Sequence, residues 1–364
     1  MTTSLPAGSG QPIIDVDTHL TDADEVLWKP FFGAAEAEMA PRVVEVDGVN
    51  RLDVGGMLLP NPGGPGVGSP LGIGAADHVA TLDDRVGFMR RLGITHAFLL
   101  PGFVGLAALD HSDPDARKVL ARAHNELVHD LAGRAPEIEF VPVVLPDDPA
   151  WSLAELERWT TRTTVRAVVS RPTTHEPRPY RDGTGSPLLA HLVDTGTALM
   201  LHGATGYHQV SPLADQFDDY RMTHVFSHPF EQMLALADLV HSGALDAGLR
   251  LAVVEAGCGW LPWFAGRLQE HYDHTGGLPR IDRDVVETLK RQVLLSVEPH
   301  DDGIEAVLDR FGAGLLSFGS DFPHWDAARP EDVDTMAERL GPEATRRILH
   351  DNAHDFFFGT GART

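Results

Sequence analysis

Short apolar runs alternate with longer amphipathic stretches along most of the chain, and this alternation constrains the fold more than any other feature. The runs cover residues 13–19, 96–100, 140–145, 165–170, 198–202, 250–255, 293–297 and 315–321. Most of them are nearly continuous in apolar residues, as strands covered on both faces are. Strands that alternate with helices about eight times predict a parallel sheet, and a closed (β/α)8 TIM barrel is its economical form.

The stretches between the runs have the periodicity of amphipathic helices. Predicted helices cover residues 82–92, 116–131, 153–161, 188–195, 230–242 and 301–311. Two regions interrupt the alternation: residues 33–78, which contain NPGGPGVGSPLGIG, and residues 203–229 after the fifth strand. We interpret the Gly/Pro-rich region as an insertion that covers the C-terminal face of the barrel. Neither an internal repeat nor a linker is evident, so we expect residues 1–364 to form a single domain.

Composition narrows the class of partner. The 364 residues include 53 acidic and 29 basic side chains, a net charge of −24 that argues against nucleic acid or an anionic membrane. The single cysteine, Cys258, excludes an intrachain disulfide and a cysteine-built metal cluster, and it fits a reducing cytosol. The N-terminus has no secretion-signal pattern, and no apolar run is long enough for a transmembrane helix. We therefore expect a cytoplasmic protein.

Polar side chains gather at the ends of the predicted strands. Asp17 and His19 end the first, His202 the fifth, Glu255 the sixth and Asp321 the last. The C-terminal ends of all strands in a parallel barrel meet at one face, where active sites lie. Carboxylates and imidazoles that converge there repel one another or go unsatisfied unless a cation lies among them. Mixed nitrogen and oxygen donors suit zinc or manganese. Each residue alone could instead cap a turn or a helix, but five successive caps explain the pattern less well.

Several sequence blocks resemble the amidohydrolase superfamily over roughly residues 12–358. They are Asp17-Thr-His19, the strand-end His202, EAGCGWLPWFAGRL, and FGSDFPH followed by ILHDNAHDFF. The similarity is greatest to the amidohydrolase-related branch, which contains aminocarboxymuconate semialdehyde decarboxylase and the resorcylate-type decarboxylases. This resemblance implies a distorted (β/α)8 barrel that binds one divalent metal ion, for which we expect zinc ahead of manganese. It places Asp17, His19, His202 and Asp321 at the metal-ligand positions.

The chain departs from that family pattern at two positions. Asp17 stands where the family usually has His or Glu, and it remains a competent oxygen ligand. Glu255 stands where the decarboxylases typically carry a general acid/base histidine. Glu255 could relay protons if partial burial raises its pKa toward neutrality, or it could bind the metal or orient His228. His228, in FSHPFEQ, is the second candidate for the acid/base role. His224 precedes it by four residues, but the segment does not have a convincing helical pattern.

The fourth predicted strand bears on metal number and on substrate binding. It lacks the lysine that bridges two metals in other branches, which favours one metal. Arg171 at its end is a candidate clamp for a substrate carboxylate, or a salt-bridge partner of a barrel carboxylate. His324, three residues after Asp321, is expected to line the substrate pocket.

These residues point to a mononuclear metal enzyme that acts on a small-molecule substrate. Our first hypothesis is non-oxidative decarboxylation of a small carboxylic acid, with Glu255 or His228 delivering the proton. The alternative is hydrolysis of an amide, ester or lactone, in which Asp321 takes a proton from water, or an unusual biosynthetic lyase or cyclase reaction. A third hypothesis, from another class, is a non-catalytic barrel used for binding. Because members of the family usually form dimers, we expect a homodimer.

Overall fold

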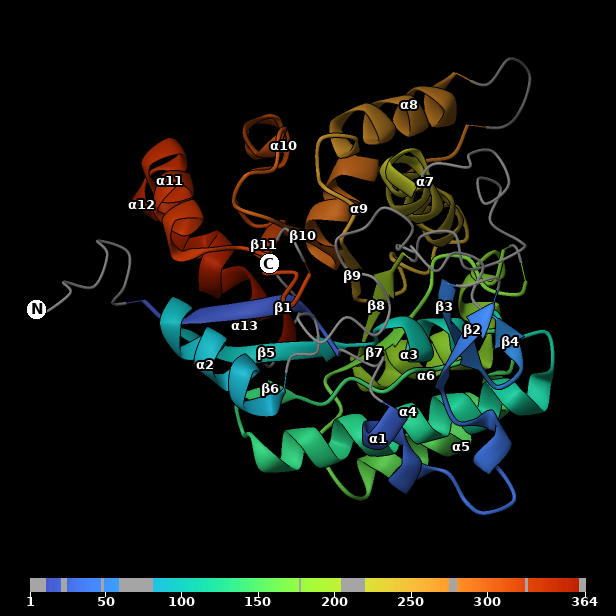
Figure 1. Cartoon of the computed structure of the whole chain (residues 1–364). Helices are drawn as coiled ribbons and strands as arrows, with labels where there is room; N and C mark the ends of the chain where they lie inside the picture. Colours follow the sequence, from blue (N-terminus) through green and yellow to red (C-terminus); the bar gives the residue numbers. More distant parts are fainter. Residues whose placement is uncertain are drawn as a thin grey trace, which may run out of the picture.

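The structure is a computed structural model, shown in Figure 1. It describes residues 11–20, 25–46, 49–58, 81–176, 178–203, 220–274, 280–324 and 327–359. The whole NPGGPGVGSPLGIG sequence and residues 204–219 lie outside these ranges, so the expectation of a cover over the barrel face is not tested there.

Parallel strands form the centre of the molecule in two hydrogen-bonded sheets. The first sheet has the order β1 (Ile13–His19), β5 (Ile94–Leu100), β6 (Ile138–Glu139). The second has the order β7 (Ala167–Ser170), β8 (Ala198–His202), β9 (Leu251–Val254), β10 (Val293–Val297), β11 (Leu316–Phe318). Every neighbouring pair in both sheets is parallel, as predicted.

Two isolated parallel bridges join these sheets into a ring. Val143, after β6, bridges to Val169 on β7. Thr18 on β1 bridges to Phe322, and the His19 N–H donates to the Phe322 carbonyl at 2.7 Å. The described strands therefore close into the predicted (β/α)8 barrel, which is distorted because the third and last strands pair regularly over only a few residues.

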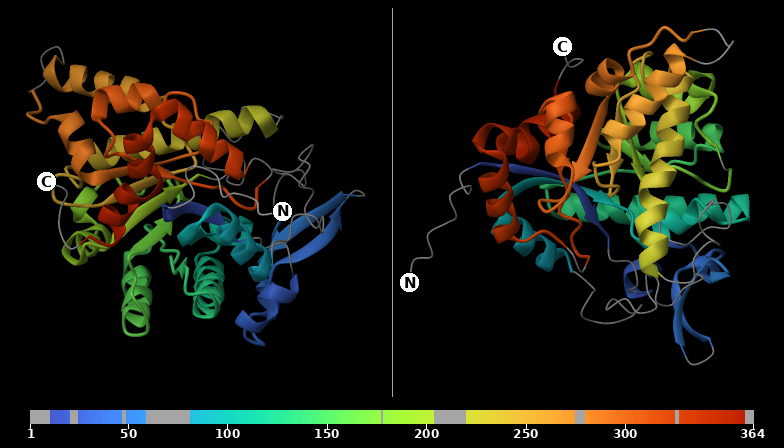
Figure 2. Two further views of the ribbon diagram at one scale, coloured as in Figure 1. Left: turned by 90° about the vertical axis from the view of Figure 1, so that its left-hand side faces the viewer. Right: turned by 90° about the horizontal axis from the view of Figure 1, so that it is seen from above.

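Helices pack around the outside of the strands (Figure 2). In chain order the helices that follow barrel strands or precede them are α2 (Leu82–Leu92), α4 (Pro114–Arg134), α5 (Pro149–Thr160), α6 (Pro187–Thr195), α7 (Tyr220–His241), α8 (Leu261–Asp273), α9 (Val285–Gln292) and α10 (Ile304–Phe311). The short α1 (Glu25–Trp28) and α3 (Phe103–Ala108) follow β1 and β5, and the chain closes with α11 (Pro330–Leu340), α12 (Pro342–Arg346), η5 (Arg347–Asp351) and α13 (Asn352–Phe357). None of the helices in the described ranges combines the length and the apolar character that crossing a bilayer requires.

The local sequence of α2 explains where this helix begins and ends. The hydroxyl of Thr81 accepts from the Asp84 N–H, and the Asp84 carboxylate accepts from the Thr81 N–H at 3.0 Å, which is a capping box. At the other end Gly93 adopts φ 82°, the left-handed conformation that terminates helices at little cost in glycine. The bounds of α2 thus coincide with the predicted 82–92.

The first part of the insertion forms a small antiparallel sheet that the sequence pattern does not predict. It has the order β2 (Arg42–Val46), β3 (Val49–Val54), β4 (Met57–Leu58). Leu52 and Val54 are buried, and His111 Nε2 lies 3.0 Å from the Gly55 carbonyl oxygen. Because His111 follows the chain segment that leaves the C-terminal end of β5, the small sheet lies on the side of the barrel to which β5 points (Figure 1).

Helix α7 begins ten residues earlier than the predicted 230–242. The expectation that the segment containing His224 and His228 is not helical is therefore wrong. Pro229 lies inside the helix and weakens its local signal, because proline cannot donate the helical hydrogen bond. Tertiary contacts compensate within the helix: the Gln232 side chain donates to the Leu201 carbonyl at 2.7 Å and holds α7 against the end of β8.

Candidate active site

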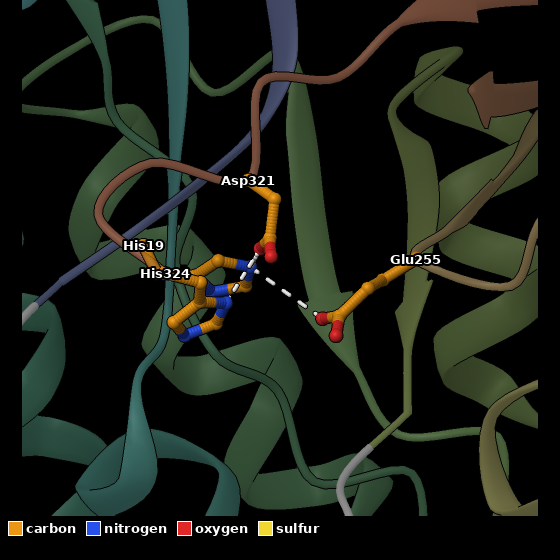
Figure 3. Close-up of side chains that lie close together, drawn as sticks. All are labelled: His19, Glu255, Asp321 and His324. Carbon is orange, nitrogen blue, oxygen red and sulfur yellow. Dashed lines mark hydrogen bonds and ion pairs between the residues drawn. The ribbon is translucent and has the colours of Figure 1, made fainter. Parts of the chain in front are cut away.

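Five polar side chains from four barrel strands meet at the C-terminal end of the barrel. Asp17 and His19 lie on β1, His202 ends β8, Glu255 follows β9 and Asp321 follows β11. Four of the five have 1–3% of their surface exposed, and Glu255 is nearly as buried. Figure 3 shows His19 and Asp321 of this cluster, together with His324, facing Glu255.

The distances within the cluster are short. His19 Nε2 lies 3.2 Å from Asp17 Oδ1, 3.2 Å from Asp321 Oδ1 and 3.7 Å from Glu255 Oε2. His202 Nε2 lies 2.5 Å from Glu255 Oε2 and 4.0 Å from Asp17 Oδ1. The structure thus brings together the four predicted metal ligands, and it adds Glu255 to them.

Backbone carbonyls set the protonation of both histidines. His19 Nδ1 lies 3.0 Å from the Pro101 carbonyl oxygen, and His202 Nδ1 lies 2.5 Å from that of Gly203. A carbonyl oxygen only accepts hydrogen bonds, so each Nδ1 carries the proton and each Nε2 presents a lone pair. This is the arrangement in which proteins hold metal-binding histidines.

The lone pairs of these imidazoles face carboxylate oxygens, which also only accept. Four buried atoms of the cluster have no hydrogen-bond partner among the described residues: Asp17 Oδ1, His19 Nε2, His202 Nε2 and Glu255 Oε2. Each unpaired buried acceptor costs about 1–3 kcal/mol. Two donors to one tetrahedral zinc ion lie about 3.4 Å apart, given metal–ligand distances near 2.1 Å. The spacing, chemistry and unpaired atoms of the cluster therefore fit a divalent metal ion.

A proton is the other cation that such a cluster attracts. Burial lowers the pKa of His19, but Asp17 and Asp321 outweigh burial and raise this pKa well above its usual value. The cluster therefore favours positive charge at the same place, whether a metal ion or a proton supplies it.

Neighbouring polar groups hold Asp17 and Glu255 in place. The Ser296 hydroxyl on β10 donates to Asp17 Oδ2 at 3.1 Å and accepts from the Glu255 N–H at 2.9 Å. Gly319 is required beside them, because a Cβ at that position would lie 2.7 Å from Asp17 Cβ. The backbone and one hydroxyl thus fix the separation of the two carboxylates.

Asp15 has a structural part in the site that sequence reasoning missed. It is fully buried, and its carboxylate accepts from the Ser320 N–H at 2.9 Å, the Ser320 hydroxyl at 2.6 Å and the Asp17 N–H at 3.1 Å. It therefore connects β1 to the loop that carries Asp321. Burial raises the pKa of Asp15 to about 7. The available signal was the alternation of Asp15 with Asp17 and His19 along one strand.

Arg85 fastens β1 from the other side, and sequence reasoning missed it too. This buried guanidinium on α2 donates to the Thr18 hydroxyl and to the His19 carbonyl oxygen. An arginine within an amphipathic helix gives no sequence signal of such a role, because most of them lie on exposed faces.

Backbone strain is concentrated on two of the site carboxylates. Among the residues that the structure describes, Glu255 (φ 52°) and Asp321 (φ 54°) are the non-glycine residues with positive φ. The left-handed conformation is unfavourable for side chains with a Cβ, and strain of this kind persists mainly at functional sites. Here it turns both carboxylates toward the histidines as the strands end.

The electrostatics of the two predicted proton donors differ from expectation. Burial raises the pKa of Glu255, but His228 and His202 outweigh it and hold this pKa well below its usual value. Glu255 would relay protons near neutrality if its pKa were raised, and the neighbouring histidines act in the opposite direction. Burial lowers the pKa of His228 to about 3, although Glu255 acts in the opposite direction. Both shifts oppose the proton-donor role that the sequence analysis gave these two groups.

His324 differs from these two groups. Its Nδ1 lies 2.6 Å from Asp321 Oδ1, and its ring stacks on His19 with centroids 4.5 Å apart (Figure 3). Burial lowers the pKa of His324, but Asp321 outweighs burial and raises it. In turn burial raises the pKa of Asp321, and His324 with His19 outweigh burial and lower it. Since 30% of the His324 side chain is exposed, it can exchange protons with solvent.

Arg171 is the predicted site residue that the structure keeps apart from the cluster. It is fully buried, forms an ion pair with Asp110, and has Nη2 3.4 Å from Glu231 Oε2. This arrangement is the salt-bridge alternative of the sequence analysis. The Thr173 hydroxyl donates to the same Glu231 oxygen at 3.1 Å, so the end of β7 is connected to α7.

Comparison with known proteins gives one family and several structures. Residues 14–359 match the sequence profile of a family described as amidohydrolase. No curated protein matches the sequence. An amidohydrolase from Mycobacterium avium subsp. paratuberculosis superposes with a TM-score of 0.73 at 20% identity, over 96% of this chain and 99% of that one.

Two solved decarboxylases are also similar in structure. The 5-carboxyvanillate decarboxylase of Novosphingobium aromaticivorans, in complex with manganese and a nitrobenzoic acid, has a TM-score of 0.71 at 17% identity, over 98% of this chain and 99% of that one. The 2,6-dihydroxybenzoate decarboxylase of Rhizobium has a TM-score of 0.66 at 16% identity, over 97% and 100%. At such identities the likeness shows the fold, and it confirms the predicted barrel.

Proposed function

The chain belongs to the amidohydrolase family, and from that premise we propose that it is a metal-dependent enzyme that decarboxylates a small carboxylic acid without an oxidant. The family match bears out the resemblance seen in the sequence blocks. The observation that carries the proposal is the convergence of unpaired, buried nitrogen and oxygen atoms at the C-terminal face. This is the face on which barrel enzymes of this type carry their active sites.

Asp17, His19, His202 and Asp321 would hold the ion, and Glu255 Oε2 is close enough to contribute. Zinc accepts such a mixed set, and the three carboxylates suit manganese as well. The manganese in the 5-carboxyvanillate decarboxylase structure supports keeping both ions in view. When bound, a divalent ion supplies a Lewis acid that neutralises charge on the substrate oxygens and on the carbanion-like transition state.

A hydroxyaryl acid is the substrate class that we propose to test first. Both similar decarboxylases act, by their names, on aromatic carboxylates that carry hydroxyl groups. A hydroxyl beside the carboxylate gives two oxygens that a metal site can bind together, which fixes the carbon–carbon bond to be broken. Arg171 is a weaker candidate for a direct substrate clamp, because a substrate would have to displace buried ion pairs with Asp110 and Glu231.

The proton that replaces carbon dioxide must come from a group that carries one. We assign this role to the His324–Asp321 pair, because His324 holds a proton against burial and has access to solvent. Glu255 and His228 remain the alternatives, although the pKa of each is lowered. The rate of decarboxylation in His324→Gln and in His228→Gln distinguishes these assignments, because loss of the group that delivers the proton should slow protonation of the product carbon.

Hydrolysis of an amide, ester or lactone is the second candidate, and the state of Glu255 favours it. A buried carboxylate that stays ionised is suited to take a proton from water. Asp321 is the second such base, with its pKa also lowered. An unusual lyase or cyclase would use the same residues.

Purified protein loaded with manganese or zinc provides the test. We expect release of carbon dioxide from hydroxybenzoic or β-keto acids, detected by a coupled bicarbonate assay. If these acids are inert while esters or lactones are cleaved, decarboxylation is wrong and hydrolysis stands. If the protein takes up no metal and turns over neither class, it is a non-catalytic barrel.

A further inference from the structure

Helix α7 presents a stripe of polar side chains to the strand ends. His224, His228 and Gln232 follow one another at intervals of four residues, so they lie on one face of the helix. The Gln232 side chain donates to the Leu201 carbonyl at 2.7 Å and to the Val254 carbonyl at 3.3 Å. It therefore fastens α7 to the ends of β8 and β9, and the two histidines of the stripe lie over the same edge.

His228 can occupy its position because residue 203 is a glycine and has no Cβ. A Cβ on Gly203 would lie 2.6 Å from His228 Cδ2, so this imidazole packs directly against the backbone that follows His202. The rings of His224 and His228 are 4.5 Å apart between centroids, and those of His202 and His228 are 6.1 Å apart. The histidines of α7 are thus neighbours of the cluster that contains His202.

Glu255 faces His19 and His202 with one carboxylate oxygen, and His224 and His228 with the other. Its Oε2 lies 2.5 Å from His202 Nε2 and 3.7 Å from His19 Nε2. Its Oε1 lies 3.4 Å from His224 Nε2 and 3.5 Å from His228 Nε2. Figure 3 shows Glu255 entering the cluster from the side opposite to Asp321 and His324. The left-handed backbone of Glu255 directs its carboxylate between the two pairs of histidines.

We propose that His224, His228 and Glu255 Oε1 form a second divalent-cation site, and that the Glu255 carboxylate bridges it to the first. One ligand atom from each of the three residues lies within 4.8 Å of the others. Two histidines and one carboxylate, with a position left for water, are the ligands of many catalytic zinc sites. The proposal rests on the proposed function, because the first site must be occupied for Glu255 to act as a bridge.

The distances are compatible with a shared ion. His224 Nε2 makes a hydrogen bond of 3.4 Å to Glu255 Oε1, and His228 Nε2 lies 3.5 Å from the same oxygen. Both distances are long for a hydrogen bond. They agree with the spacing of about 3.4 Å between two donors to one tetrahedral zinc ion. A second ion would also explain the carboxylate that stands where related decarboxylases carry a histidine.

Counting bound metal on the full chain tests the proposal. Metal-stripped protein is dialysed against micromolar manganese, and bound manganese is measured by mass spectrometry together with the electron paramagnetic resonance spectrum. We expect two ions per chain and a spectrum broadened by coupling through the bridging carboxylate. His224→Ala should retain one ion and show the six-line spectrum of isolated manganese. His241→Ala, at the far end of the same helix, should behave as the unchanged protein.

The other outcomes overturn the proposal in distinguishable ways. One ion per chain in the unchanged protein would refute the second site and leave the proposed function standing. Two ions that persist in both His224→Ala and His228→Ala would place the second ion elsewhere. No tightly bound ion at all would overturn the proposed function together with the second site.

Discussion

Individual buried polar atoms in this protein differ in whether a neighbour satisfies them. Asp15 has three hydrogen bonds and serves as a fastener, whereas Asp17 Oδ1 and His19 Nε2 have none and face each other. The first kind stabilises a fold, and the second kind is retained at the expense of stability until a ligand arrives. The sequence could indicate that all three residues are polar and close together. It could not indicate which of them is satisfied, because the partner of Asp15 is Ser320, some 300 residues away.

Asp321→Asn tests the assignment of this residue at the catalytic centre. Asparagine keeps the shape and tolerates the left-handed backbone, but it removes the charge that pairs with His19 and His324. We expect turnover to fall by about 10²–10⁴-fold, with an unchanged circular dichroism spectrum. Asp309→Asn, on the exposed side of α10, serves as the control. Near-normal activity in Asp321→Asn would remove this residue from the mechanism.

The burial of His124 leads us to expect that the free energy of unfolding depends on pH. It is fully buried on α4, neither ring nitrogen has a hydrogen-bond partner among the described residues, and burial lowers its pKa to about 3. The unfolded chain binds this proton near pH 6.5 and the folded chain does not, so stability is lost as the pH falls through this interval. Between pH 6.5 and 5 the loss is about 2 kcal/mol.

Chemical denaturation of His124→Leu at several pH values measures this contribution. Leucine binds no proton, so the decline in the free energy of unfolding below pH 6.5 should become shallower by that amount. At pH 8 the variant should be about as stable as the unchanged protein, because an unpaired buried imidazole contributes little beyond its apolar contacts. Parallel pH curves for the two proteins would contradict the prediction.

Individual elements show which sequence signals determine structure. The bounds of β1, β8 and β10 coincide with the predicted 13–19, 198–202 and 293–297, because β8 and β10 are mainly apolar and β1 begins with apolar residues before its polar end. The predicted strand 140–145 contributes only one bridge, since the Asn125 side chain accepts from the Val143 N–H at 2.7 Å and donates to its carbonyl. Pro142 has no N–H for pairing at all. These competing partners lie outside the run, so its apolar pattern could not reveal them.

The candidate site also has some features that local sequence reveals and others that depend on residues distant in sequence. Residues at the ends of long apolar strands were identified from the sequence, because barrel closure alone brings them to one face. The helical start of α7 was not, so the contact of His224 with Glu255 could not be foreseen, and the contact of His228 with Glu255 could only be left as an alternative. The pairing of Arg171 with Asp110 and Glu231 could only be left as an alternative, since both partners are distant in sequence.

The seam between β11 and β1 depends on one glycine. A Cβ at Gly319 would lie 2.7 Å from Asp17 Cβ, a contact too close for either strand to absorb without moving. We expect Gly319→Ala to destabilise the fold by about 1–3 kcal/mol and to weaken metal binding at least tenfold, as seen by calorimetric titration. Gly314→Ala, whose Cβ would meet nothing within 4 Å, is the matched control. Equal metal affinity in both variants would show that Asp17 does not depend on this packing.

For the molecule as a whole, the proposed metal site connects the first strand of the barrel to the last. Its ligands come from β1, from β8 and from the loop after β11, so the first and last strands share one ion. An ion that binds only the folded chain stabilises it by about 2.7 kcal/mol at a hundredfold excess over Kd. We expect a chelator to lower the calorimetric Tm by several degrees in a single transition, consistent with one domain. An unchanged Tm after complete metal removal would separate the ion from the fold.

Assembly is the remaining prediction at this scale. Helix α7 exposes large apolar side chains on its outer surface: Met222, Val225, Phe230 and Leu234. Exposed apolar patches of this kind mark interfaces, and the expected homodimer would cover this one. Sedimentation should show a dimer for the unchanged protein and a monomer for the double variant Phe230→Lys, Leu234→Lys. Trp263→Lys, at a more exposed residue on α8, should remain dimeric. A monomeric unchanged protein would end the prediction.

The left-handed backbone at Glu255 and Asp321 also bears on how such a chain can change over time. Glycine at either position would relieve about 1 kcal/mol or more of strain, so the mutations that silence the chemistry are also ones that make the barrel sturdier. Selection for activity must therefore retain these two carboxylates, although glycine at either position would make the fold more stable. Where such selection lapses, a robust and inert barrel is the nearest descendant.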